Sequence, residues 1–269
     1  MTDIIIIGGG PAGVSAALTA KNRGKSVKII TNSMEQSNLW KSKLIENYPG
    51  CPNVSGEDIL KTFRKQIDDA GIELINARAL NALPMAKSFA VSCGQDYYEC
   101  KALILTVGIT QQLVYPGEEE FLGRGVSYCA TCDGMLYRGK KVAVIGLNEE
   151  AASEAEFLRS NGCEVEYFDK TRAKSFEIRG NNSVTALLAD ETVYPVDGVF
   201  ILRSTIAPNN FLAGLQIENG HIAADSSMRT STDGVFAAGD CTGRPYQIAR
   251  AVGQGNTAAL SACEYLDKM

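Results

Sequence analysis

The fold of this chain is decided by residues 3–13, which read DIIIIGGGPAG. The four isoleucines form a continuous apolar run of the kind found in a strand buried on both faces of a parallel sheet. The glycines follow at once, and the small residues of VSAALTA at 14–20 favour a helix. After the helix stop at Gly24, the apolar segment SVKII at 26–30 predicts a second strand.

This order of strand, turn, helix and strand is the context in which a GxGxxG motif predicts a dinucleotide-binding site. Gly8 permits a tight turn, Gly10 lets a pyrophosphate approach the backbone, and Gly13 permits close packing of helix on strand. The backbone amides at the helix start, around Pro11 and Ala12, then face the phosphates. A plain glycine-rich turn is the alternative, and the intact context makes it the weaker interpretation.

The first motif does not by itself distinguish FAD from a nicotinamide nucleotide. Many such sites place an acidic residue at the end of the second strand, where it holds a ribose. Here that strand is followed by Thr31, Asn32 and Ser33, and Glu35 comes slightly later. The usual acid is therefore missing or displaced, and the choice depends on the other end of the chain.

The segment TDGVFAAGD at 232–240 predicts a turn and a short apolar strand that ends at Gly239 and Asp240. YQIA at 246–249 then leads into a small-residue helix that we expect to continue through Ala259. This pattern resembles the second flavin-contacting motif of the flavoprotein disulfide reductases that have two dinucleotide-binding domains. In that family the aspartate of the Gly-Asp pair binds the ribityl chain of FAD.

Three further segments resemble the low-molecular-weight thioredoxin reductases within that class. They are ENYPG at 46–50, LILTVG at 103–108 and SYCATCDG at 127–134. Val107 departs from the pattern, because threonine is usual there. The resemblance covers nearly the whole chain and implies FAD as the cofactor. By resemblance, the FAD-binding residues are Gly8, Gly10, Pro11, Ala12, Gly13, Asn38, Leu39, Asn47, Gly108, Gly239, Asp240, Gln247, Ile248 and Ala249.

Two of the eight cysteines, Cys129 and Cys132, form a CxxC pair, and the other six are scattered. Such a pair can close a small-ring disulfide whose thiols exchange with the disulfide of a partner. It could also be half of a zinc site, but the sequence has no second CxxC, and its single histidine is distant at position 221. We therefore expect a redox disulfide and no metal, with the scattered cysteines as packed thiols.

Asp133 directly follows the pair and can donate or accept the proton that accompanies the electrons. A purely structural role as a helix cap or turn residue is the alternative for this aspartate. By resemblance, Cys132 is the sulfur nearest the flavin, and Cys129 attacks the partner, which the family identifies as thioredoxin. The predicted catalytic residues are thus Cys129, Cys132 and Asp133.

A second strand and turn begin with KVAVIG at 141–146, but the glycine motif that follows is damaged. Asn148 stands where the backbone has to approach a pyrophosphate, and Glu149 and Glu150 open the following helix. Each carboxylate would repel a nearby pyrophosphate by on the order of 1 kcal/mol even in water-like surroundings. Asp169, after the next strand, would repel the 2′-phosphate of NADPH but could hold the ribose of NADH. We expect neither nucleotide to bind.

This combination resembles the ferredoxin-dependent flavin thioredoxin reductases, in which reduced ferredoxin delivers electrons to FAD. Ferredoxins are typically acidic, so their docking requires a local basic patch despite the net charge of −5. The candidate patch is Lys170, Arg172, Lys174 and Arg179, with a solvated loop as the alternative. Trp40 could shield the flavin, but a core or interface role is favoured. A pyridine-nucleotide enzyme with an atypical site and a non-catalytic FAD redox sensor remain alternatives.

The predicted fold is α/β, with two Rossmann-like dinucleotide-binding domains of the flavoprotein disulfide reductase type, the second reduced and inserted in the first. Residues 1–112 and 210–269 form a discontinuous FAD-binding domain, and 113–209 form a degenerate pyridine-nucleotide-like domain that carries the CxxC. The family implies a homodimer. The acidic net charge argues against nucleic-acid binding, and no apolar stretch approaches the roughly 20 residues of a membrane span. The start MTDIIII lacks the features of a signal peptide, so a cytoplasmic location is expected.

Overall fold

The structure is a computed structural model that describes all residues except 33, 38, 109–113, 170 and 204–207. The chain divides into two compact units. Unit 1 consists of Met1–Gln111 and Ala207–Met269, and unit 2 consists of Gln112–Ile206. Each unit contains a parallel sheet with helices packed on it, so the predicted α/β fold with two Rossmann-like units is confirmed.

The sheet of unit 1 contains five parallel strands in the order β3-β2-β1-β6-β16. These strands are β1 (Thr2–Ile7), β2 (Val27–Thr31), β3 (Glu73–Asn76), β6 (Asp96–Leu105) and β16 (Val235–Ala237). The first half of β6 also pairs antiparallel with β5 (Phe89–Cys93), which pairs with β4 (Asn81–Pro84). The isoleucines of β1 are buried on both faces, as their continuous apolar run predicts.

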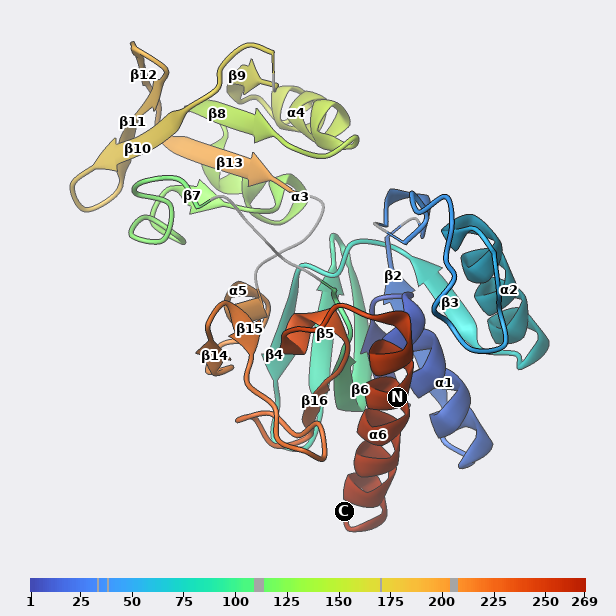
Figure 1. Cartoon of the computed structure of the whole chain (residues 1–269). Coiled ribbons are helices and arrows are strands. Elements are labelled where there is room, and N and C mark those ends of the chain that lie inside the picture. The colour runs from blue at the N-terminus through green and yellow to red at the C-terminus, as the bar shows by residue number, and fades with distance from the viewer. Residues whose placement is uncertain (33, 38, 109–113, 170, 204–207) are drawn as a thin grey trace. The chain divides into compact units, whose positions relative to one another are not determined.

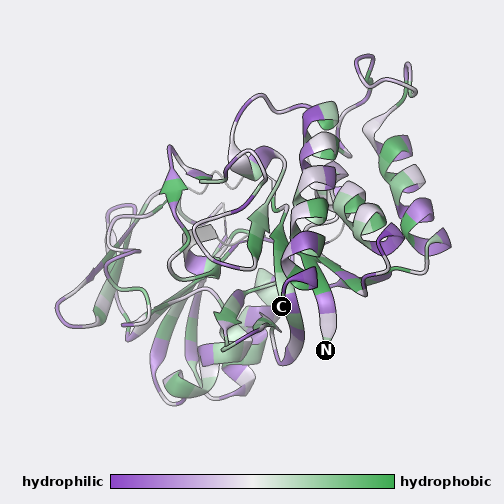
Figure 2. Cartoon of the chain, turned by 90° about the horizontal axis from the view of Figure 1, so that it is seen from below, coloured by the Kyte–Doolittle hydropathy of each residue, from purple (hydrophilic) through white to green (hydrophobic). Residues whose placement is uncertain are grey.

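Three helices pack on one face of this sheet: α1 (Pro11–Asn22), α2 (Gly56–Asp69) and α6 (Ile248–Asp267). Figure 1 shows α1 and α6 side by side, and Figure 2 shows hydrophobic residues along the strands that these helices cover. The helix predicted to end near Ala259 continues for two more turns, because Ala262 and Cys263 are buried in the same core. Among the described residues, no helix is both long and apolar enough to cross a membrane.

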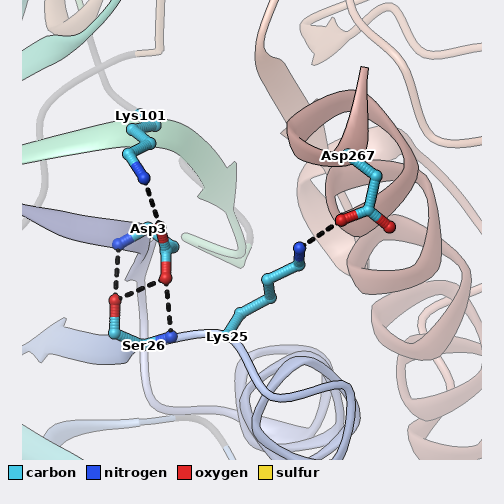
Figure 3. Close-up of polar contacts among 5 residues, drawn as sticks. All are labelled: Asp3, Lys25, Ser26, Lys101 and Asp267. Atoms are coloured by element: carbon cyan, nitrogen blue, oxygen red, sulfur yellow. Dashed lines mark hydrogen bonds and ion pairs between the residues drawn. The ribbon is translucent and has the colours of Figure 1, made fainter. Parts of the chain in front are cut away.

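Polar contacts tie the amino ends of the unit 1 strands together (Figure 3). Asp3 of β1 accepts hydrogen bonds from Ser26, just before β2, and from Lys101 Nζ of β6 at 2.8 Å. Burial acts to raise the pKa of Asp3, but the hydrogen bonds from Lys101 and Ser26 outweigh it and lower the pKa to about 2. Lys25 forms an ion pair with Asp267 at the end of α6.

The shorter connecting elements of unit 1 lie between these strands and helices. They are η1 (Met34–Gln36), α5 (Pro208–Phe211), β14 (Ile217–Glu218), β15 (His221–Ile222) and η3 (Asp240–Thr242).

Unit 2 contains a parallel sheet in the order β7-β13-β8-β9. Its strands are β7 (Val126–Ser127), β8 (Lys141–Gly146), β9 (Glu164–Phe168) and β13 (Gly198–Leu202), and its helices are α3 (Ala130–Asp133), η2 (Gly134–Tyr137) and α4 (Ala151–Ser160). A separate antiparallel sheet contains β10 (Phe176–Gly180), β11 (Val184–Ala189) and β12 (Thr192–Pro195). The rings of Phe168, Phe176 and Tyr194 contact edge to face where this sheet packs on β9.

Candidate active site

The first glycine turn has the geometry that its sequence predicts. Gly8 follows β1 with φ +112°, and a Cβ there would lie 2.3 Å from the carbonyl oxygen of Thr106. A Cβ at Gly13 would lie 1.9 Å from the carbonyl oxygen of Gly8. Both positions therefore require glycine because the backbones of α1 and β6 pack directly on the turn.

Gly10 needs to be glycine for a different reason. A Cβ at this position would meet nothing within 4 Å, so the protein itself leaves the space in front of the turn open. Gly10 is the N-cap of α1, no side chain caps this helix, and its first turn carries no acidic residue. An open turn with uncapped helix amides fits an anionic pyrophosphate. These are the features that FAD would need here.

The C-terminal motif lies beside this turn. Ala238 N donates to Leu105 O at 2.9 Å, so the end of β16 meets the end of β6 next to the first glycines. Gly239 has φ +84°, and a Cβ there would lie 2.9 Å from that of Ala12. Partial burial raises the pKa of Asp240, and the nearby Arg250 acts against this shift.

Two loops expected to reach the flavin also meet. Asn47 Nδ2 donates to Gln247 Oε1 at 2.8 Å, across 200 residues of sequence. Gln247 is the N-cap of α6, so this bond places the ENYPG loop at the amino end of that helix, which begins with Ile248 and Ala249. The structure thus brings most of the predicted FAD residues to one edge of the unit 1 sheet.

The remaining predicted FAD residues are less closely connected to this group. Leu39 packs against the unit 1 core, and its carbonyl would lie 1.7 Å from a Cβ on Gly56. Gly108 follows β6 with φ +71°. Asn38 lies outside the described residues. Trp40 also packs, half-buried, against the unit 1 core, in agreement with the favoured core role.

Three polar residues at this edge were missed by the sequence analysis. Thr31 Oγ1 accepts from Gly9 N at 3.0 Å, at the end of β2 where a ribose-binding acid was sought. Thr106 Oγ1 donates to the backbone of the first turn, and Gln254 Oε1 accepts from Gly239 N at 2.9 Å. Only Thr106 had a sequence signal, because it lies inside the LILTVG segment.

In unit 2, Cys129 and Cys132 form a disulfide at the start of α3, directly after β7. Cys129 is buried and Cys132 is exposed. Asp133, the last residue of α3, accepts a hydrogen bond from Ser127 Oγ at 2.7 Å. All three predicted catalytic residues therefore lie within one turn of chain, at the carboxyl edge of the parallel sheet, where α/β folds place their functional groups.

A buried ion pair contacts Tyr128, the residue before Cys129. This pair was not predicted. Arg203 follows β13 and forms two hydrogen bonds with Glu118, at 2.7 and 2.8 Å. Tyr128 donates its hydroxyl proton to Glu118 Oε1 at 2.9 Å, and Tyr115 N donates to Glu118 Oε2 at 2.9 Å. Both carboxylate oxygens are therefore satisfied, as burial of a charge requires.

The turn after β8 differs from the turn after β1. A Cβ on Gly146 would lie 2.4 Å from the Tyr167 hydroxyl, so the Tyr167 side chain occupies the space beside this glycine. Asn148 turns toward the protein and donates from Nδ2 to Arg203 O at 3.1 Å. Glu150 is the N-cap residue of α4, and Glu154 lies in its first turn. Gly8 of the first turn is crowded as well, so the two turns differ in the Asn148 side chain, which stands where the first turn has Gly10, and in the acidic start of α4.

Two members of the candidate basic patch, Arg172 and Arg179, form ion pairs, which reduces the positive charge they offer. Arg172 pairs with Glu166 at 2.7 Å and lies 4.4 Å from the centre of the Phe168 ring. Arg179 pairs with Glu177 at 2.7 Å. Lys170 lies outside the described residues. Asp169 accepts hydrogen bonds within its own turn, and these lower its pKa.

Comparison with known proteins agrees with this geometry. A model of the pyridine nucleotide-disulphide oxidoreductase family matches residues 2–173 and 156–255. Thioredoxin reductases of Listeria innocua and Helicobacter pylori are 30% and 33% identical to the chain, over 99% of its length and 94% and 99% of theirs.

Solved structures agree as well. A ferredoxin-flavin thioredoxin reductase from Clostridium acetobutylicum has a TM-score of 0.90 and 38% identity, covering 100% of this chain and 99% of that one. The atypical thioredoxin reductase TRi from Desulfovibrio vulgaris Hildenborough has a TM-score of 0.74 and 27% identity, with coverage of 100% and 99%. The chain therefore belongs to the pyridine nucleotide-disulphide oxidoreductase family, as an FAD-dependent disulfide oxidoreductase homologous to thioredoxin reductases.

Proposed function

We propose that this protein reduces the disulfide of thioredoxin through Cys129 and Cys132, and that its electrons come from reduced ferredoxin rather than from NADPH or NADH. The observation that carries the choice of donor is the contrast between the two glycine turns. The first turn is open at Gly10, whereas the second turn has Asn148 at the equivalent position, with its side chain bonded to Arg203 O. The first turn of α1 carries no acidic residue, whereas Glu150 and Glu154 stand at the start of α4. A cytoplasmic homodimer is part of the same proposal and rests on the likeness to thioredoxin reductases alone.

The thiol chemistry follows from the dithiol form of the pair. Cys129 Sγ attacks the partner's disulfide, so that a bond forms between Cys129 and one partner sulfur while the partner's S–S bond breaks. The released partner sulfur takes up a proton. Cys132 Sγ then attacks Cys129 Sγ, re-forms the disulfide and releases the second partner thiol. The partner gains two electrons and two protons, and the Cys129–Cys132 dithiol is oxidised.

Asp133 exchanges the protons in this proposal, because its carboxylate lies in the same short helix as the two sulfurs. Gly8, Gly10, Gly13, Gly239 and Asp240 would hold FAD in unit 1, together with the loops joined by the Asn47–Gln247 bond. FAD, when bound, supplies the two electrons that return the disulfide to the dithiol.

The donor assignment has a second support. The solved structure from Clostridium acetobutylicum, 38% identical over the whole chain, is described as a ferredoxin-flavin thioredoxin reductase. Glu154 in the first turn of α4 adds negative charge beside the second turn, and a pyrophosphate there would be repelled. The alternative of a pyridine-nucleotide enzyme requires a pyrophosphate to be accommodated beside the Asn148 side chain and the acidic residues of α4.

The experiment is anaerobic thioredoxin reduction by photoreduced ferredoxin, with NADPH and NADH as parallel donors. We expect turnover with ferredoxin alone. Cys129→Ser should abolish turnover while FAD stays bound, and Cys163→Ser is the matched control, because Cys163 is a buried free thiol of the same unit. Turnover with NADPH or NADH and none with ferredoxin would refute the donor. No turnover with any donor would favour the FAD redox sensor instead.

A further inference from the structure

Among the described residues, the Ser127 hydroxyl donates a side-chain hydrogen bond to the Asp133 carboxylate. Ser127 ends β7 and is 4% exposed. Its Oγ lies 2.7 Å from Asp133 Oδ2 and 3.3 Å from the carbonyl oxygen of Cys129. A serine hydroxyl carries one proton, and the closer, charged acceptor takes it.

The same hydroxyl is held in place by the disulfide segment. Cys129 N donates to Ser127 Oγ at 3.1 Å, so Oγ accepts from Cys129 while it donates to Asp133. Side chains alternate along an extended segment, and Tyr128 accordingly points the other way, to Glu118. The position of the hydroxyl between Cys129 and Asp133 is therefore set by the backbone and by the buried ion pair behind it.

The other titratable groups near Asp133 do not replace this contact. Tyr137 of η2 is close enough that, after burial, the charge of Asp133 raises its pKa further. Glu154 of α4 accepts from Ala130 N at 3.4 Å and packs against the same short helix. Tyr137 and Glu154 would each add negative charge near Asp133 if ionised, and neither would carry a positive charge if neutral. The favourable contact to the Asp133 carboxylate therefore comes from Ser127.

We propose that Ser127 is a positioning residue for Asp133. Its hydroxyl holds the carboxylate beside the Cys129–Cys132 pair, so that the carboxylate can accept a proton from the attacking thiol. This inference rests on the proposed proton-carrying role of Asp133, but it is independent of the electron donor.

The test uses the FAD-bound protein, reduced with a small dithiol that is then removed. Its single-turnover reaction with the chromogenic disulfide 5,5′-dithiobis(2-nitrobenzoate) is followed by stopped flow as a function of pH. We expect the wild-type rate to persist below the pH at which a free thiol ionises, because Asp133 accepts the proton of the attacking thiol, and Asp133→Asn to keep only the rise that follows thiol ionisation. Ser127→Ala should lower the rate in this acidic range by about tenfold and leave the rate at high pH unchanged. Ser127→Thr should restore the wild-type rate.

Two comparisons separate positioning from a structural effect. In the Asp133→Asn background, Ser127→Ala should cause no further change, because Ser127 acts through Asp133. Ser160→Ala, which removes an exposed hydroxyl from α4, should leave the profile unchanged. A wild-type rate at low pH in Ser127→Ala would overturn the inference, as would an equal rate loss at every pH. Because ferredoxin takes no part in this assay, a wrong donor assignment would not alter its result.

Discussion

At the scale of single residues, the three glycines of the first turn serve two different purposes, backbone packing and ligand binding. Gly8 and Gly13 are required by packing, because a Cβ at either position would collide with backbone. Gly10 has open space in front of it, so its missing side chain matters for what the turn binds. Substitutions at these positions should therefore separate cofactor binding from folding.

We expect Gly10→Val to fold and to lose FAD affinity by tenfold or more, because the side chain would project into the space left for the pyrophosphate. Gly13→Ala should instead destabilise the protein, since its Cβ would lie 1.9 Å from Gly8 O. Flavin fluorescence titration measures the affinity, and thermal unfolding measures the stability. Gly24→Ala is the control for FAD affinity alone, because Gly24 lies beyond the opposite end of α1; its φ of +75° means that this variant should also lose some stability. Equal FAD affinity in Gly10→Val and Gly24→Ala would contradict this assignment.

Asp3 makes a prediction about acid stability. Its pKa is lowered from 3.8 to about 2 in the folded protein, so folding is favoured while this carboxyl is charged. That contribution, about 1 kcal/mol for a partly exposed group, is fully present above the unfolded pKa and is lost as pH falls from about 4 to about 2. Asp3→Asn should lower the free energy of unfolding at neutral pH and flatten its dependence on pH in this range. Urea unfolding at a series of pH values measures this dependence. If the free energy of unfolding changes with pH in the same way for both proteins, the contacts in Figure 3 do not stabilise the fold.

At the scale of elements, the sequence predicted what local patterns determine. The apolar runs of β1, β2, β8 and β9, the first glycine turn and the start of α6 all lie where their patterns indicated. The disulfide between Cys129 and Cys132 was also predicted. Pairings across long sequence distances were not. Glu118 and Arg203 are 85 residues apart, and each looks like an ordinary surface charge in the sequence.

The same limit applies to the basic patch and to Ser127. Arg172 was predicted as part of a basic patch, and its partner Glu166 lies on β9, to which the following turn returns Arg172. Ser127 lies inside the SYCATCDG segment, but its role depends on the turn that brings Asp133 back to it. Side-chain pairing is set by tertiary geometry rather than by local propensity.

We expect the buried Glu118–Arg203 ion pair to be essential for the stability of unit 2. Glu118→Gln leaves the Arg203 guanidinium buried without its counter-ion, and we expect a loss of about 3–5 kcal/mol. Glu177→Gln removes a carboxylate of similar geometry from the exposed pair with Arg179 and should cost less than about 1 kcal/mol. Guanidinium chloride unfolding followed by circular dichroism compares the two variants. Similar losses in both would mean that burial of the Glu118–Arg203 pair carries no special weight.

At the scale of the whole molecule, the chain contains two similar α/β units whose turns have diverged. The turn of unit 1 is open at Gly10, whereas the turn of unit 2 carries the Asn148 side chain at the equivalent position. Unit 2 contains the sheet that supports Cys129 and Cys132. In the proposed function, this sheet serves the disulfide chemistry without binding a nucleotide, and only the electron source differs from that of a pyridine-nucleotide enzyme.

The most direct test of this account is anaerobic stopped-flow mixing of the oxidised, FAD-bound protein with NADPH, NADH or reduced ferredoxin, with flavin absorbance as the readout. We expect reduced ferredoxin to bleach the flavin absorbance rapidly and both nucleotides to leave it unchanged on the same timescale. Rapid bleaching by NADPH or NADH would contradict the account, because it would mean that the turn at Asn148 admits a nucleotide.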